Sequence, residues 1–103
     1  MSDVTKTSDN GWEEDKVVDL KEALVNQFFD ECKGTEEYLE LSEVAGHKYP
    51  DTPYAQILKD IAREEHVHKN HIKAILKDMC VTFTDEMDKA DAESEEAFKE
   101  LFR

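Results

Sequence analysis

The chain has few of the residues that break helices or cross-link a fold. Its 103 residues include three glycines, two prolines and two cysteines. Cys32 and Cys80 lie far apart and neither belongs to a Cys-x-x-Cys pair, which excludes a cysteine knuckle for zinc or iron. We expect Cys32 to be a buried structural thiol. No signal peptide and no apolar run of about 20 residues is visible, so we expect a cytoplasmic protein with free thiols.

Basic residues are also scarce. Lysine and arginine number 13 against 26 acidic residues, which gives a net charge of −13. Such a surface repels nucleic acid and anionic membranes, so we expect neither as a partner, and it attracts cations. No segment rich in Val, Thr and Tyr alternates with a period of two, and the composition therefore predicts an all-α fold. A domain of this size buries only about 60–65% of its unfolded surface, which makes a lone monomer marginal.

The distribution of apolar residues divides the chain into an arm and one helical domain. Residues 1–16 are polar and acidic and are predicted to form a disordered arm, with the helical domain spanning residues 17–103. Within the domain, helices are expected over about 17–45, 53–79 and 85–102. The predicted architecture is a long antiparallel helical hairpin followed by a short C-terminal helix.

Turn and capping signals separate these helices. Gly46 suits the C-terminal end of the first helix, and Pro50 prevents it from continuing. Thr52 can cap the second helix, with Pro53 at its first position. Thr84 is the expected N-cap of the third helix.

The second helix carries two polar residues within an otherwise apolar stripe. Taken one turn at a time, its predicted buried face reads Ile57, Ile61, Glu65, His68, Ile72, Ile75. The stripe of the first helix likewise passes through a carboxylate, that of Glu31. The remaining histidines lie off these stripes, and we expect all three at the surface: His47, His66 and His71.

Spacing predicts that the three polar residues meet. Glu31 lies 14 residues before Ala45, whereas Glu65 and His68 lie 13 and 16 residues after Thr52. At about 1.5 Å per residue they are roughly 21, 20 and 24 Å from the turn, and therefore level in an antiparallel hairpin. A mid-helix glycine, Gly34, costs about 1 kcal/mol relative to alanine. It therefore indicates close packing or a kink near this level.

A buried carboxylate is unfavourable unless another group compensates it. Two carboxylates and an imidazole at one level of a core are best compensated by a cation. Because Glu65 and His68 are three residues apart on a helix, one metal ion can contact both. A site rich in carboxylates favours iron or manganese over zinc. The alternative is that Glu65 and His68 face solvent at a helix edge while Glu31 pairs with a lysine.

Two segments resemble the ferritin-like di-iron proteins of the rubrerythrin type. "FFDECKGTEEYLELSEVA", residues 28–45, has a Glu followed seven residues later by a Tyr, as in the first helix of that family. "ILKDIAREEHVH", residues 57–68, resembles its second helix with "IA-x-x-E-x-x-H". The size, acidity and layout are most similar to the encapsulated-ferritin branch. The resemblance covers roughly residues 24–76.

This resemblance implies a di-iron centre built from two copies of the chain. Such a centre takes a Glu from each of two helices and a Glu-x-x-His from each of two more. One chain supplies half of it, so homodimerisation would complete the ferritin-like four-helix bundle. Glu31, Glu65 and His68 are the implied iron ligands. Tyr38 is implied to hydrogen-bond a ligand carboxylate, the alternative being an aromatic core residue with its hydroxyl at the edge.

The implied activity is that of a ferroxidase, which oxidises Fe(II) to Fe(III) for iron storage or detoxification. A homodimer or larger ring is the implied assembly, with an encapsulin nanocompartment as a further location. Two features depart from the encapsulated branch: Lys33 stands where a second acidic residue is expected, and "EEAFKELFR" lacks an obvious shell-docking extension. Two other functions stay open, a metal-free acidic helical module that dimerises as an adaptor and a di-iron protein that reduces peroxide.

Overall fold

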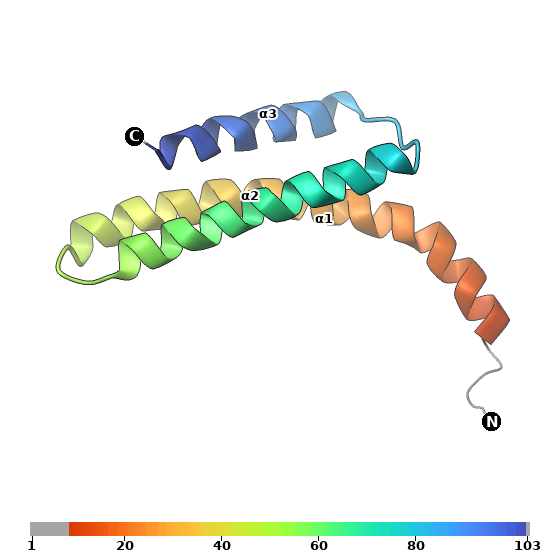
Figure 1. Ribbon diagram of the computed structural model, residues 1–103, viewed down its shortest axis with the longest axis horizontal. Helices are drawn as coiled ribbons and strands as arrows, with labels where there is room; N and C mark the ends of the chain where they lie inside the picture. Colours follow the sequence, from red (N-terminus) through yellow and green to blue (C-terminus); the bar gives the residue numbers. More distant parts are fainter. Residues whose placement is uncertain (1–8, 103) are drawn as a thin grey trace.

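Three helices make up the described part of the chain in this computed structural model, which covers residues 9–102. Helix α1 spans Asp9–Lys48, α2 spans Tyr54–Asp78 and α3 spans Asp85–Glu100. Helices α1 and α2 form an antiparallel hairpin, and α3 runs alongside it (Figure 1). The predicted all-α fold and the predicted order of helices are therefore confirmed. None of the described helices has both the length and the apolar character needed to cross a membrane.

Helix α1 begins earlier than the sequence led us to expect. It starts at Asp9 rather than near residue 17, so residues 9–16 of the expected disordered arm are helical. No proline precedes Pro50, and nothing in this stretch therefore forces the helix to start later. The first part of α1 extends past the end of α2 (Figure 1). The rest of the expected arm, residues 1–8, lies outside the described residues.

The helix ends follow part of the predicted turn signals: α1 continues past Gly46 to Lys48, three residues beyond its expected end, and α2 has Pro53 at its N-cap in place of Thr52. At the hairpin turn, the hydroxyl of Thr52 donates to the carbonyl of Tyr49 at 2.6 Å and accepts from the backbone N–H of Tyr54 at 3.4 Å. The side chain of Thr84 caps α3 by accepting from the backbone N–H of Met87 at 3.1 Å. Three acidic residues in the first turn of α3 also interact favourably with the helix dipole.

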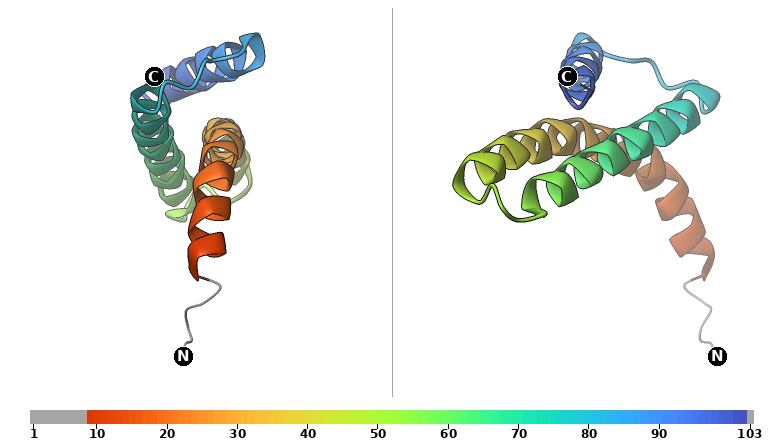
Figure 2. Two further views of the ribbon diagram at one scale, coloured as in Figure 1. Left: turned by 90° about the vertical axis from the view of Figure 1, so that its right-hand side faces the viewer. Right: turned by 60° about the vertical axis from the view of Figure 1, so that its left-hand side comes forward.

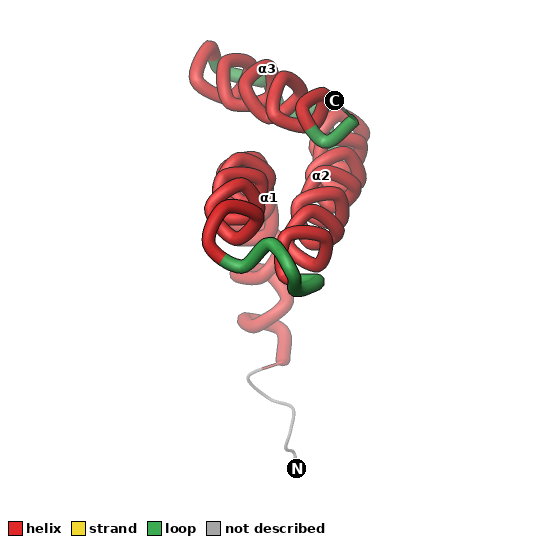
Figure 3. The backbone as a smooth tube through the Cα atoms, turned by 90° about the vertical axis from the view of Figure 1, so that its left-hand side faces the viewer, coloured by secondary structure: helices red, strands yellow, loops and turns green. Residues whose placement is uncertain are grey.

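Helix α3 covers one side of the hairpin and leaves the opposite side open. The end-on view places α3 across α1 and α2 (Figure 3), and the rotated views agree (Figure 2). One hydrophobic cluster lies beneath the start of α3 and is built on Phe28, Cys32, Leu76 and Met87. A second lies near its end and is built on Leu39, Ala62 and Leu101. We call the side beneath α3 the covered face and the other side the open face.

The covered face also buries a lysine. Lys69 is 0% exposed, and its Nζ donates to Asp91 Oδ1 and to Glu95 Oε2, both at 2.6 Å. Lys73 forms a further ion pair with Asp91. A charged side chain is buried at such a site only when it is paired, and here α3 supplies both carboxylates. These ion pairs fix α3 to α2.

Two expectations about α2 are wrong because of α3. The residues that α2 buries are Ala62, His66, Lys69 and Leu76, not the isoleucine stripe. The outer members of that stripe, Ile57 and Ile75, are 50% and 46% exposed. His66 is buried rather than at the surface, because its ring stacks on Phe98 of α3 with 3.7 Å between centroids.

Candidate metal centre

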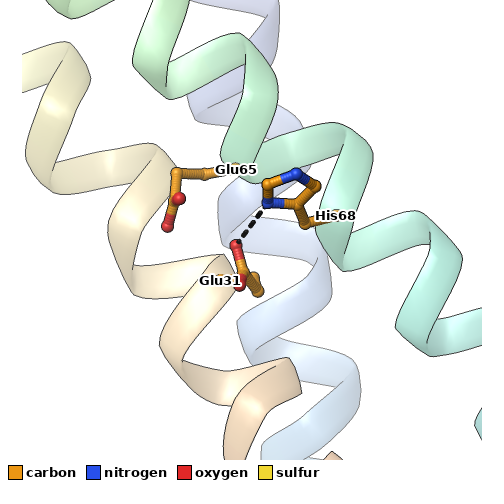
Figure 4. A group of neighbouring side chains, drawn as sticks. All are labelled: Glu31, Glu65 and His68. Carbon is orange, nitrogen blue, oxygen red and sulfur yellow. Dashed lines mark ion pairs between the residues drawn. The ribbon is translucent and has the colours of Figure 1, made fainter.

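The three residues predicted to meet do meet. Glu31 of α1 and Glu65 and His68 of α2 each offer a ligand atom, and these atoms all lie within 4.8 Å of one another. Figure 4 shows the three side chains between the two helices. In the part of the chain that the structure describes, this is the one group of three or more His, Cys, Asp or Glu residues close enough to hold a metal ion.

The group lies on the open face, as the burial of the adjacent residues in the sequence shows. Cys32 and Lys69 follow Glu31 and His68 directly, and both are buried on the covered face. Successive residues on a helix are about 100° apart, so the two ligands turn away from α3. Exposure increases across the group: Glu31 is buried, Glu65 is half-buried and His68 is exposed.

Glu31 holds a carboxylate that is buried and only half satisfied. Its Oε2 accepts a hydrogen bond of 2.8 Å from the side-chain amide of Gln27, one turn earlier on α1. Its Oε1 lies 3.5 Å from Nδ1 of His68 and has no hydrogen-bond partner. Among the described residues no lysine pairs with Glu31, which differs from the alternative of a Glu31–lysine pair, whereas His68 is exposed as that alternative had it. A buried polar oxygen without a hydrogen-bond partner is uncommon, and a bound ion is one of the groups that can satisfy it.

Glu65 brings a second carboxylate against the first. Burial raises its pKa above the ordinary 4.5, and the nearby charge of Glu31 raises it further, while His68 acts in the opposite direction. The side chain of Glu65 lies directly against Gly34 of α1. The predicted close packing at Gly34 is thereby confirmed.

These observations fit a divalent cation. Two carboxylates repel each other in this position, and a cation between them would reverse the sign of that interaction. The donor set is rich in oxygen with one imidazole, which suits iron or manganese. A groove of about 420 Å³ reaches the group at His68. It is lined by Asp60, Arg63, Glu64, Val67 and His68.

Tyr38 does not join the group within one chain. Its ring packs against the cluster of Leu39, Ala62 and Leu101, and among the described residues its hydroxyl makes no hydrogen bond to Glu31. This arrangement matches the alternative of a core aromatic residue. The hydrogen bond from Tyr38 to a ligand carboxylate stays a prediction for the assembled protein.

The other histidines and the cysteine near Glu31 lie apart from the group. His47 and His71 are exposed, as expected. Cys32 is a buried free thiol, also as expected, and burial raises its pKa so that it stays protonated. Sequence reasoning missed Gln27 as the partner of Glu31. Its position one turn before Glu31 was an available signal, because residues four apart on a helix are neighbours.

The fold and the site together define a class of protein. Ferritin-like di-iron proteins are built from pairs of helices in which one helix carries a Glu and the other a Glu-x-x-His motif. Helices α1 and α2 form such a pair. Residues 22–103 of the chain match the Rubrerythrin family. The chain therefore belongs to the rubrerythrin family. Comparison with curated proteins returned no match, and comparison with solved structures returned none.

Proposed function

We propose that the chain is a ferroxidase whose di-iron site is shared between two copies. The observation that carries this proposal is the convergence of Glu31, Glu65 and His68 around an unpartnered buried oxygen. One chain offers two carboxylates and one imidazole. A ferritin-like centre needs twice that number, and a twofold partner would supply the second set.

The exposed apolar side chains support pairing through the open face. On α2, Ile57 and Ile75 flank the ligands at helical spacing and are about half exposed. On α1, Leu20 and Leu41 lie three helical turns before and after Glu31 and are 46% and 49% exposed. A second copy placed on this face would cover these side chains and bring its own ligands to the same level. Bound cations would also offset the repulsion between two chains of net charge −13.

The residues would have distinct tasks in this assembly. Glu31 would bind iron through the oxygen that has no hydrogen bond, while Gln27 holds its other oxygen. Glu65 would bridge the two metal ions, and each His68 would bind one of them. Fe(II) is the substrate: two ions lose one electron each, and one O₂ takes up both electrons with two protons to give hydrogen peroxide. Tyr38 would not bind iron itself; its hydroxyl would donate a hydrogen bond to a ligand carboxylate.

Anaerobic loading followed by exposure to air tests the activity. Fe(II) is added to the protein without oxygen, air is admitted, and the near-UV absorbance of Fe(III) is followed. We expect Glu31→Ala, Glu65→Ala and His68→Ala to abolish both stoichiometric iron binding and rapid oxidation. His71→Ala and Glu40→Ala, which change exposed residues, serve as controls and should behave like the unaltered protein. Equal iron content and equal rates in all six proteins would refute the proposal.

Sedimentation tests the shared site. Iron should increase the dimer population at micromolar protein concentration in the unaltered protein and not in Glu31→Ala. The same assembly with and without iron would mean that packing alone joins the copies, as in a metal-free dimerisation module. A ring of dimers, and its packaging in an encapsulin shell, belong to the proposal as well, and the mass of the native particle tests them.

A further inference from the structure

Gly34 makes an unusually close contact with a candidate ligand. A Cβ atom placed on Gly34 would lie 3.1 Å from Cδ and 3.3 Å from Cγ of Glu65, and closer still to Oε1. Side-chain carbons do not approach a carboxylate oxygen so closely. The carboxylate of Glu65 therefore occupies the space that any other residue at position 34 would fill. We call this space the Gly34 notch.

Backbone conformation does not account for a glycine at this position. Among the described residues no glycine has a positive φ, and Gly34 lies within the regular helix α1. Glycine is one of the least favourable residues inside a helix, because folding costs it more backbone conformational entropy than any other residue and it has no side chain to pack. The reason for Gly34 must therefore be the absence of a side chain.

The Gly34 notch lies beside Glu31. Residues three apart on a helix occupy the same face, so a side chain resting against Gly34 is next to Glu31. Glu65 reaches across from α2 into this position, and its ligand atom comes within 4.8 Å of those of Glu31 and His68. The notch thus determines how near the second carboxylate comes to the first.

We propose that Gly34 is a positioning residue for the metal centre, acting through the carboxylate of Glu65. This inference rests on the proposed metal-binding function. A methyl group at position 34 would push the carboxylate of Glu65 away from Glu31 and toward solvent. Because Glu65 is half-buried and its carboxylate ends a flexible side chain, the displacement would leave the packing of α1 and α2 intact. The effect of a side chain would fall on metal binding rather than on folding.

Gly34→Ala tests this inference, and Gly46→Ala is its matched control. Gly46 also lies in α1, but a Cβ there would meet only Cβ of Ala55, at an ordinary 3.8 Å. Fe(II) affinity is measured anaerobically by calorimetry, and the stability of the metal-free proteins by urea unfolding. We expect neither variant to lower the urea midpoint. We expect Gly34→Ala to weaken Fe(II) binding by about 10–100-fold, as when an outer partner of a metal ligand is lost, and Gly46→Ala to leave it unchanged.

A shorter acid at position 65 distinguishes a positioning role of Gly34 from a packing role. Asp is one methylene shorter than Glu, so Glu65→Asp withdraws the carboxylate from the notch. The affinity lost through Gly34→Ala should be smaller in the Glu65→Asp background than in the unaltered chain, which a double-mutant cycle measures.

The outcomes separate the two proposals. If the unaltered chain binds no Fe(II), the proposed function fails and this inference fails with it. If the unaltered chain binds Fe(II) and Gly34→Ala binds equally well, only the role of Gly34 is refuted. A lower urea midpoint for Gly34→Ala, with no coupling to Glu65→Asp, would show that Gly34 serves helix packing instead.

Discussion

The covered and open faces of the hairpin bury charge in contrasting ways. On the covered face, the ammonium group of Lys69 is fully enclosed and two carboxylates of α3 accept its hydrogen bonds. On the open face, the carboxylate of Glu31 is buried beside that of Glu65, and one of its oxygens has no partner. The first face is electrostatically complete within one chain. On the second face, the unpartnered oxygen of Glu31 has the ring of His68 3.5 Å away and, among the described residues, no lysine or arginine partner.

The pKa shifts follow the same division. On the covered face, burial would raise the pKa of Asp91, but hydrogen bonds from Lys69 and Lys73 outweigh it and lower the pKa. On the open face, burial and Glu31 both raise the pKa of Glu65. Carboxylates of similar burial thus shift in opposite directions because one has cations for neighbours and the other has an acid. Perturbed pKa values cluster at functional sites, and the raised pKa of Glu65 fits that pattern.

Removing the buried cation should have the largest effect on stability. Lys69→Met keeps most of the side-chain volume but leaves Asp91 and Glu95 without their central partner. We expect the free energy of unfolding to fall by about 2–3 kcal/mol, somewhat less than for a fully buried pair, because Lys73 remains near Asp91. Urea unfolding of the metal-free protein measures this.

Lys99→Met is the control, because Lys99 forms an exposed pair with Glu96 and should contribute less than about 1 kcal/mol. Equal losses from the two variants would mean that burial of Lys69 has no special energetic role, and the contrast between the faces would disappear.

Removing a charge from the open face should have the reverse effect. Glu65→Gln removes a charge that is half-buried and repelled by Glu31, and we expect it to stabilise the metal-free protein by about 0.5–2 kcal/mol, while Fe(II) binding weakens by about 100-fold or more. The combination of greater stability and weaker binding distinguishes a ligand from a structural residue. Urea unfolding and anaerobic calorimetry measure the two quantities.

The stabilisation should depend on pH with a definite sign. The pKa of Glu65 is higher in the folded than in the unfolded chain, so protonation favours the folded state. The advantage of Glu65→Gln should therefore be complete above the raised pKa and should shrink as the pH falls toward 4.5. An advantage that stays constant over this range would indicate that the pKa of Glu65 is not raised in the folded chain.

The smallest effect is expected at Tyr38. Among the described residues its hydroxyl makes no hydrogen bond, so Tyr38→Phe should change the stability of the metal-free chain by less than about 0.5 kcal/mol. A slower oxidation of Fe(II) in the same variant would assign the hydroxyl to the assembled site. A large loss of stability without iron would contradict the position of Tyr38 described above.

The hairpin and the metal group could be predicted from sequence because both depend on regular helix geometry. A fixed rise per residue, together with the turn signals around Pro50, determined which positions of α1 and α2 would lie level. The group of Glu31, Glu65 and His68 followed directly. The prediction of a metal group rested on polar residues that interrupt apolar stripes, a pattern that local helix propensity does not explain.

The position of α3 could not be predicted, and most errors follow from that. Helix α3 is weakly amphipathic, and it is held partly by ion pairs to Lys69 rather than by an apolar stripe. Lysine is almost never fully buried unless it is paired, so sequence alone gave no reason to place Lys69 in the core. His66 was misplaced for the same reason, since its partner, Phe98, belongs to α3. The early start of α1 was missed because no residue there marks a boundary.

The tight turn between α1 and α2 has a practical consequence. It lies about 25 Å from the level of Glu31, and Tyr49 and Pro50 are exposed there. A break in the backbone at this turn would leave one carboxylate on the first fragment and the Glu-x-x-His pair on the second. Under the proposed function, iron bound by ligands from both pieces would favour their reassembly, so reassembly of the fragments would report on iron in solution.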